Sequence, residues 1–292
     1  MPNRVFVVTG ATAGIGKALA MDLAKEGQTI VLVARNIGRG EEVLRAIRSG
    51  ARNPDIDLQV GDLSNLSSVR ALAEGLTTKY KTIDVLINNA SVYRRTRSVT
   101  VDGFEEMFVT NHLGPFLLTY LLLDSLKAAA QVHGSARILN ITAPSTVPLN
   151  FDDLQGKQNF NSLRTFGATK TANLLFTFEL ARRLENTGVT VNAIHPGLAR
   201  SGLMKESFFL MRLITRLVSS PPEKVSKTIL PVALAPEFHN VTGKFLHNGK
   251  EIKAFPYAYE RSVQQALWET SELLISAEVT PTNGSPTSAT ES

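Results

Sequence analysis

A cluster of glycines near the N-terminus constrains the fold of this chain more than any other feature. Residues 9–16 read Thr-Gly-Ala-Thr-Ala-Gly-Ile-Gly, between an apolar β-branched run at 5–8 and a helical pattern at 17–25. This order predicts a strand, a tight turn and a helix. A side chain in place of the glycines would block the turn and keep backbone N–H groups from an anion at the helix start. Such turns also occur without a ligand, so the motif needs its context before it indicates a pyrophosphate site.

The alternation of strand and helix patterns continues along the chain. Further apolar runs lie at 29–34, 83–87, 136–141 and 189–194. We therefore predict an α/β fold, a Rossmann-type doubly wound parallel sheet of about seven strands in a single domain over residues 1–275. Ligands then bind at the carboxyl ends of the strands. Residues 276–292 are rich in Ser, Thr, Pro and Gly, and we predict a disordered tail there.

Several motifs, in the expected order, resemble those of the short-chain dehydrogenase/reductase family. They are the T-G-x-x-x-G-x-G turn at 9–16, the Asn-Asn-Ala signature at 88–90, and the Pro-Gly turn at 196–197. The resemblance covers roughly residues 4–275. The segments 111–119, 144–165, 172–177 and 267–269 further resemble the retinol-dehydrogenase-like subgroup. The resemblance to the family implies hydride transfer between a nicotinamide and a small molecule.

The resemblance implies a cofactor site spread over the ends of the strands. Its residues are Gly10, Thr12, Ala13, Gly14, Ile15, Gly16, Arg35, Asp62, Leu63, Asn89, Ala90, Lys170, Pro196, Gly197 and Ser201. Arg35 stands where an NAD-dependent relative has a carboxylate for the ribose hydroxyls, and an arginine suits the 2′-phosphate of NADP(H) instead. A solvated charge at a strand end is the alternative. Ser91 replaces a glycine of the family, so we expect a slightly altered adenosine half.

The catalytic positions depart from the family pattern. Phe166 stands four residues before Lys170, where the family has the tyrosine that exchanges a proton with the substrate oxygen. Ala143 stands where a serine would hydrogen-bond the substrate carbonyl. Thr142 is expected on the opposite face of the strand, because successive side chains alternate. Lys170 and Asn111, which support the tyrosine in the family, are both present.

Three functions of different classes are compatible with this site. The first is an NADP(H)-dependent oxidoreductase that uses another proton donor, for which Tyr93 and Asp152 are candidates, with structural roles as the alternative for both. The second is a non-redox catalyst, a cyclase, isomerase or lyase, that holds a reactive substrate in a folded conformation. The third is a catalytically silent NADP(H)-binding regulatory protein. Because the cofactor motifs and Lys170 are retained, we rank the oxidoreductase first.

Two segments are expected to shape the substrate site. Residues 202–221 carry apolar side chains at helical spacing, and we predict an amphipathic lid over a lipophilic substrate. A lid packed on its own core and an interfacial membrane helix are the alternatives. Arg94, Arg95 and Arg97 form the densest basic cluster, at the mouth of this site or on an exposed loop.

Composition limits the partners. The chain has no cysteine, and its five histidines show no paired zinc spacing, so we predict no metal. The formal charge of +5 comes from scattered residues, which argues against a nucleic-acid partner. No uncharged apolar run reaches the ~20 residues that span a bilayer, and the expectation is a cytoplasmic protein without a transmembrane segment. The sequence leaves a homodimer and a homotetramer open.

Overall fold

The architecture is one mixed sheet covered by helices. The computed structural model describes residues 4–50, 55–197 and 220–276. The strands follow the order β3-β2-β1-β4-β5-β6-β7-β8, with β8 alone antiparallel to its neighbour. They are β1 (Val5–Thr9), β2 (Thr29–Ala34), β3 (Ile56–Val60), β4 (Val85–Asn88), β5 (Ala136–Ile141), β6 (Val189–His195), β7 (Lys244–His247) and β8 (Lys250–Glu251). The predicted doubly wound parallel sheet is confirmed, and the short β8 extends it beyond seven strands.

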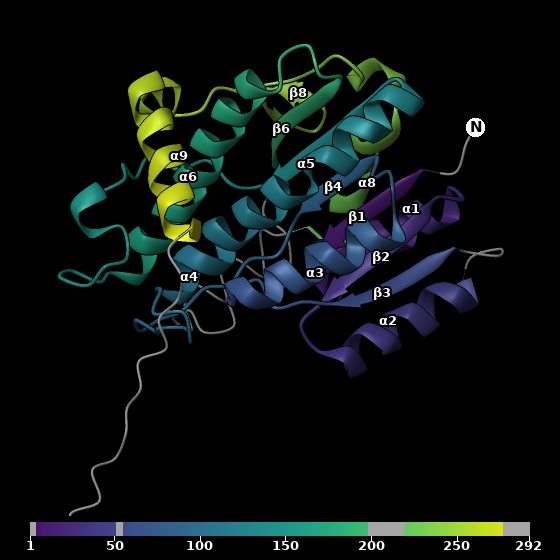
Figure 1. Cartoon of the computed structure of the whole chain (residues 1–292), viewed down its shortest axis with the longest axis horizontal. Coiled ribbons are helices and arrows are strands. Elements are labelled where there is room, and N and C mark those ends of the chain that lie inside the picture. The colour runs from purple at the N-terminus through teal and green to yellow at the C-terminus, as the bar shows by residue number, and fades with distance from the viewer. Residues whose placement is uncertain (1–3, 51–54, 198–219, 277–292) are drawn as a thin grey trace, which may run out of the picture.

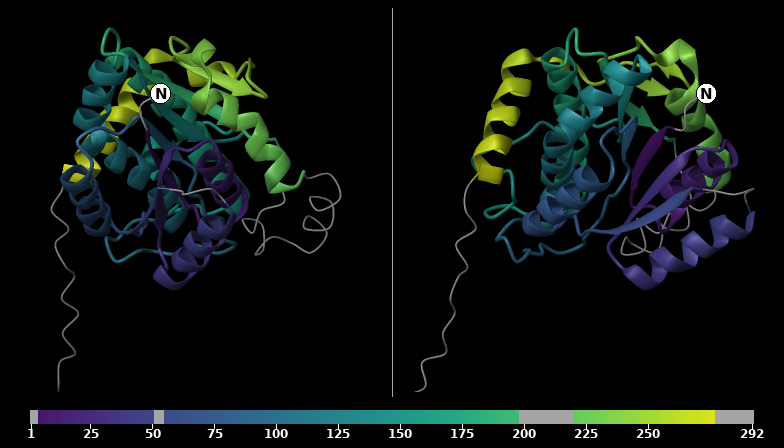
Figure 2. Two further views of the ribbon diagram at one scale, coloured as in Figure 1. Left: turned by 90° about the vertical axis from the view of Figure 1, so that its right-hand side faces the viewer. Right: turned by 45° about the vertical axis from the view of Figure 1, so that its right-hand side comes forward.

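Two layers of helices cover the sheet (Figures 1 and 2). One face carries α1 (Gly14–Lys25), α2 (Ile37–Gly50) and α8 (Pro222–Leu234). The other carries α3 (Leu66–Lys79), α5 (Gly114–His133), α6 (Ser162–Arg183) and α9 (Arg261–Ser276). Shorter elements are α4 (Glu106–Phe108), a π turn (Val109–Leu113), and 3₁₀ turns at Phe151–Asp153, Pro236–Phe238 and Pro256–Tyr259. Of the predicted tail only Ser276 is described, as the end of α9.

Burial on both faces explains the composition of the central strands. All side chains of β2, β4 and β5 are buried, as is typical of parallel strands between two helical layers. Two of the polar exceptions, Asn88 of β4 and Asn140 of β5, pair with each other. Asn88 Nδ2 donates to Asn140 Oδ1 at 2.8 Å, and Asn140 Nδ2 donates to Thr177 Oγ1 at 2.9 Å. These hydrogen bonds remove much of the cost of burying amides and tie β4, β5 and α6 together.

The longest helical stretch, from Glu106 to His133, includes α4, the π turn and α5. Within the described ranges it is the one stretch long and apolar enough to cross a membrane, and 67% of its apolar window is buried inside the protein. Phe116 and Trp268 meet in this core, with ring centroids 4.9 Å apart. Packing against α3, α6 and α9 therefore accounts for its apolar character.

Strand order brings the predicted site residues to one edge of the sheet. β1 pairs with β4, β4 with β5, and β5 with β6, all in parallel. Because parallel neighbours end at the same edge, the segments that follow these strands lie side by side there.

Candidate functional site

The glycine turn packs directly against the segment that follows β4. Gly10 has a φ of +64°, and a Cβ there would lie 2.9 Å from the Ala90 Cα. At Gly16 a Cβ would lie 2.5 Å from both Asn89 Nδ2 and the Gly10 carbonyl oxygen. Asn89 Nδ2 donates to the Thr9 carbonyl at 2.9 Å, and Thr9 Oγ1 accepts from the Ala90 N–H at 3.1 Å. The structure thus brings together two motifs that the sequence predicted to meet.

The start of α1 suits an anion. Ala13 occupies the N-cap position and makes no side-chain hydrogen bond to the helix, and Gly14 follows with a φ of +53°. An alanine leaves the N–H groups of the first turn without a side-chain cap, so they keep their capacity to bind a phosphate. Thr12 and Ile15 are half-buried beside them. The residues present therefore fit the pyrophosphate of a dinucleotide.

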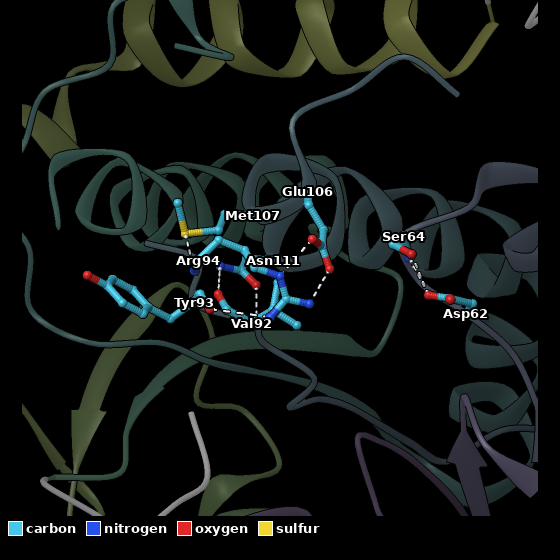
Figure 3. A network of polar contacts seen from close by, with 8 residues as sticks. All are labelled: Asp62, Ser64, Val92, Tyr93, Arg94, Glu106, Met107 and Asn111. Atoms are coloured by element: carbon cyan, nitrogen blue, oxygen red, sulfur yellow. Dashed lines mark hydrogen bonds and ion pairs between the residues drawn. The ribbon is translucent and has the colours of Figure 1, made fainter. Parts of the chain in front are cut away.

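Arg35 lies exposed after β2, and its charge affects the pKa of Glu106. Burial alone would raise the pKa of Glu106. The hydrogen bonds and charge of Arg94, the hydrogen bond of Ser98 and the charge of Arg35 act in the other direction, and the net result is a lowered pKa. Arg94 Nε lies 2.7 Å from Glu106 Oε2 in a two-pronged pair (Figure 3). Arg94 is therefore part of an ion pair rather than a freely solvated charge.

Asp62 and Leu63, at the end of β3, are held in a local turn. Asp62 Oδ1 accepts from the Ser64 N–H at 2.9 Å and from Ser64 Oγ at 2.7 Å (Figure 3). Leu63 is buried, and a Cβ at Gly114 would lie 2.2 Å from its carbonyl oxygen. Gly114 thus lets α5 approach this turn closely, which fixes the position of Asp62.

Lys170 is buried beside an aromatic ring and a hydroxyl. Its Nζ lies 4.8 Å from the centre of the Phe166 ring and donates to Ser91 Oγ at 2.9 Å. Burial lowers the pKa of Lys170 to about 8. The Ser91 hydroxyl thus faces Lys170, a contact that the sequence did not predict. Its single signal was the serine after Asn89 and Ala90.

Tyr93 packs edge-on against Phe166. The ring centroids are 5.6 Å apart at 80°, and the Tyr93 hydroxyl donates to Ser162 Oγ at 3.0 Å. This hydroxyl points away from Asn111 (Figure 3). Tyr93 is only 1% exposed, so its side chain fills the wall of the site beside Phe166. A catalytic role for Tyr93 stays a prediction.

Asn111 lies in the π turn and connects the segment after β4 with α6. Its Oδ1 accepts from the Val92 N–H at 2.7 Å, and its Nδ2 donates to the Val92 carbonyl at 3.0 Å (Figure 3). Its Nδ2 also donates to Thr169 Oγ1 at 3.1 Å. Thr169 Oγ1 in turn donates to the Phe166 carbonyl at 2.7 Å. A π turn widens a helix locally and occurs frequently at functional sites. Asn111 therefore fixes the segment after β4 against α6, beside Lys170.

The hydroxyls near Ala143 are directed at the backbone of α6. Thr142 Oγ1 donates to the Lys170 carbonyl at 3.1 Å, and Ser145 Oγ donates to the Gly167 carbonyl at 2.8 Å. Ala143 itself is half-buried between them. Thr142 and Ser145 thus hold the start of α6 in place, as structural contacts.

The insert that contains Asp152 docks on the loop with the arginines. Asp152 is exposed in the 3₁₀ turn Phe151–Asp153. Arg97 Nε donates to the Gln155 carbonyl at 3.0 Å, and the Glu105 N–H donates to Gln155 Oε1 at 3.2 Å. Arg97 therefore anchors the insert.

The turn after β6 reaches the same edge. Pro196 and Gly197 are half-buried, and Gly197 adopts a φ of +74° with its N–H 3.4 Å from His195 Nδ1. Ser201, residues 202–219 of the predicted lid and residues 277–292 of the predicted tail lie outside the described residues. Among the described residues no group of His, Asp or Glu side chains could hold a metal ion.

Comparisons with known proteins give a family and several relatives. A family model described as short chain dehydrogenase matches residues 4–209. Retinol dehydrogenase 12 of Mus musculus is 39% identical over 280 residues, which cover 94% of this chain and 87% of that protein. Polyprenol dehydrogenase of Homo sapiens is 34% identical over 278 residues, covering 92% and 84%.

Two solved structures have a fold similar to that of this chain. A crystal structure of an uncharacterized protein from Mycobacterium Paratuberculosis superposes with a TM-score of 0.73 at 30% identity, covering 95% of each chain. A variant of actinorhodin polyketide ketoreductase with NADPH gives a TM-score of 0.65 at 26% identity, covering 84% of this chain and 95% of that one.

Proposed function

The chain belongs to the short chain dehydrogenase family, and we propose that it is an NADP(H)-binding member that acts on a lipophilic small molecule through a modified active site. The observation that carries this proposal is the Phe166 ring, 4.8 Å from Lys170 Nζ. In the family pattern that position brings a tyrosine hydroxyl beside the lysine. A phenyl ring fills the same space and cannot exchange a proton. Lys170, Asn111 and the glycine turn are retained, so the proposal keeps the family's cofactor and changes its proton donor.

The choice of NADP(H) is supported by charge. Arg35 is exposed after β2, and its charge contributes to the lowered pKa of Glu106. A positively charged group at the end of the second strand suits a 2′-phosphate, whereas a carboxylate there would suit the free ribose hydroxyls of NAD. When bound, the nicotinamide would supply or accept a hydride. The chain's own residues would bind it and position the substrate.

A lipophilic substrate is supported by the relatives and by the walls of the site. The relatives matched over most of the chain are named for retinol and polyprenol, two lipophilic alcohols. Phe166 and Tyr93 supply aromatic surface beside Lys170, where an apolar substrate loses less on desolvation than a polar one.

Non-redox catalysis is the second candidate. It is favoured by one observation, that Phe166 and Ala143 place neither of the family's two catalytic hydroxyls at their positions. General acid–base catalysis contributes ~10²–10⁴ in rate, so ordinary carbonyl reduction without a replacement donor would be slow. A buried lysine ammonium could still polarise a substrate oxygen during cyclisation or isomerisation.

One experiment separates these functions. The purified protein is mixed with NADPH and retinaldehyde, used here as a lipophilic carbonyl probe, and NADPH absorbance and the alcohol product are followed together. An oxidoreductase consumes one NADPH for each alcohol formed. Conversion of the probe to another product without NADPH consumption would replace the redox function with the non-redox one. Binding of NADPH without any conversion would favour the regulatory protein.

A further inference from the structure

Ser91 brings a hydroxyl to Lys170 from a different segment of the chain than Phe166. Ser91 follows β4, whereas Phe166 and Lys170 lie on α6. Lys170 Nζ donates to Ser91 Oγ at 2.9 Å, and Ser91 is half-buried at the edge of the sheet where the cofactor turn ends. The family pattern has a glycine here and a tyrosine at Phe166. This chain therefore lacks the tyrosine hydroxyl on α6 and carries a serine hydroxyl on the segment after β4.

The Ser91 proton differs from those of the neighbouring hydroxyls. Tyr93 donates its proton to Ser162, Thr142 donates to the Lys170 carbonyl, and Ser145 donates to the Gly167 carbonyl. Ser91 Oγ instead accepts from Lys170, and no acceptor among the described residues receives its proton. Of these four hydroxyls, Ser91 is the one that can donate without breaking a hydrogen bond that holds α6 or its neighbours.

We propose that Ser91 is the proton-donating hydroxyl of the modified site and that Lys170 replenishes its proton. This inference rests on the proposed oxidoreductase function and adds the donor that it requires. As hydride reaches the carbonyl carbon of the substrate, the C=O π electrons move to the oxygen. The oxygen takes the proton of Ser91 Oγ, and Ser91 Oγ takes a proton from the Lys170 ammonium. The neutral amine of Lys170 then recovers a proton from solvent, so charge and protons balance.

Serine is a weak acid, so its proton must leave as another arrives. The direct contact between Lys170 Nζ and Ser91 Oγ allows that transfer without rearrangement. Burial makes the Lys170 ammonium a better proton donor than a solvated lysine, since it lowers the pKa to about 8. The Phe166 ring leaves the ammonium within cation–π distance and offers no competing acceptor oxygen.

The first test compares two variants with a matched control. Ser91→Gly installs the family residue and removes the hydroxyl, and we expect kcat for retinaldehyde reduction to fall at least ~10²-fold while the Kd for NADPH changes less than about threefold. Ser91→Thr keeps a hydroxyl and should recover a large part of the loss. As the control, Ser49→Ala removes an exposed serine hydroxyl near the end of α2, outside the candidate site, and should leave kcat within about twofold. Full activity in Ser91→Gly would overturn the assignment.

The second test asks whether Ser91 is needed because Phe166 has no hydroxyl. In the Phe166→Tyr, Ala143→Ser background a tyrosine can donate the proton, so Ser91→Gly should cost less than about threefold there. An equal loss in both backgrounds would mean that Ser91 only shapes the site, and would overturn its role as donor. If the Phe166→Tyr, Ala143→Ser protein binds NADPH yet oxidises none, the oxidoreductase proposal fails, and the assignment of Ser91 fails with it.

A readout without substrate tests the contact itself. The ¹³Cε signal of Lys170, identified by its loss in Lys170→Arg, is titrated in the NADPH complex of the wild type and of Ser91→Gly. A hydroxyl oxygen that accepts from the ammonium favours the charged form, so its removal should lower the midpoint of the titration. Superimposable titrations would show that Ser91 and Lys170 are not coupled, and would reject the relay whatever the substrate.

Discussion

The turn at the start of α1 and the start of α6 differ in how tightly the fold constrains them. At the turn, Gly10 and Gly16 touch the backbone or amide of the segment after β4, and even a methyl group would collide. On α6, Phe166 fits against Tyr93 and Lys170 while the helix continues unbroken to Arg183. We call the glycine turn at the start of α1 the cofactor end of the site, and the start of α6 with Phe166 its catalytic end. Backbone contacts fix the cofactor end, whereas the catalytic end depends on side chains that can be exchanged. Chemistry can therefore change at α6 without a change of fold.

The largest expected effect is a gain of function at the catalytic end. Phe166→Tyr with Ala143→Ser should raise NADPH-dependent reduction of retinaldehyde by ~10² or more, because both family hydroxyls return to positions supported by Asn111 and Lys170. Steady-state kinetics of the double variant and both single variants measure it. An unchanged rate would show that the restored hydroxyls take no part in proton transfer.

Replacing Lys170 by methionine should stabilise the cofactor-free protein at neutral pH. Burial lowers the pKa of Lys170 from 10.5 to about 8, so between these values the unfolded chain binds more protons and the free energy of unfolding rises with pH. The penalty is fully present below pH 8. Lys170→Met should therefore raise the free energy of unfolding by up to about 3 kcal/mol at pH 7, and by much less near pH 10.5.

Urea unfolding of both proteins at the two pH values checks this expectation. The exposed Lys81→Met serves as the control and should change stability by less than about 0.5 kcal/mol at either pH. A stabilisation by Lys170→Met that is the same at both pH values would come from packing and not from the buried charge.

At the cofactor end, adding one methyl group should be costly. Gly16→Ala places a Cβ 2.5 Å from the Gly10 carbonyl oxygen, which is backbone and cannot move aside freely. We expect a loss of about 1–3 kcal/mol in the free energy of unfolding and weaker NADPH binding. Gly75→Ala lies inside α3, where a Cβ would be 3.5 Å from Gln59 Oε1, and should instead raise stability by up to about 1 kcal/mol. Equal changes in stability for Gly16→Ala and Gly75→Ala would show that the close contact at Gly16 does not constrain this position.

The smallest expected effect concerns cofactor choice. NADPH should bind at least tenfold more tightly than NADH, a difference of about 1.4 kcal/mol, and Arg35→Asp should abolish or invert it. Arg39→Asp, an exposed charge change on the neighbouring α2, should preserve the preference. Calorimetric titration of the three proteins with NADPH and NADH measures the six affinities. Equal binding of NADH and NADPH by the wild type would leave Arg35 as a solvated charge.

The sequence predicted the elements fixed by local pattern and missed contacts between distant side chains. The glycine turn and the buried strands follow from residue type and periodicity, and the structure confirms the fold that they imply. The contact of the Ser91 hydroxyl with Lys170, 79 positions away in sequence, was not predicted, and the expected change in the adenosine half stays a prediction. The Tyr93–Ser162 and Arg94–Glu106 contacts were missed for the same reason, because each depends on how separate segments meet. The π turn at Asn111 has no periodic signal to reveal it.

The central claim is that the cofactor end binds NADPH independently of the residues at the catalytic end. The NADPH affinities of two proteins test it most directly. Calorimetry gives the Kd for NADPH of the wild type and of the Phe166→Tyr, Ala143→Ser variant under identical conditions. If the cofactor end is built independently of the catalytic hydroxyls, the two values agree within about twofold, less than 0.5 kcal/mol, although the rates of reduction differ ~10²-fold. A wild type that binds NADPH tenfold more weakly than the variant, or not at all, would contradict the account, because Phe166 and Ala143 would then belong to a site that has lost its cofactor.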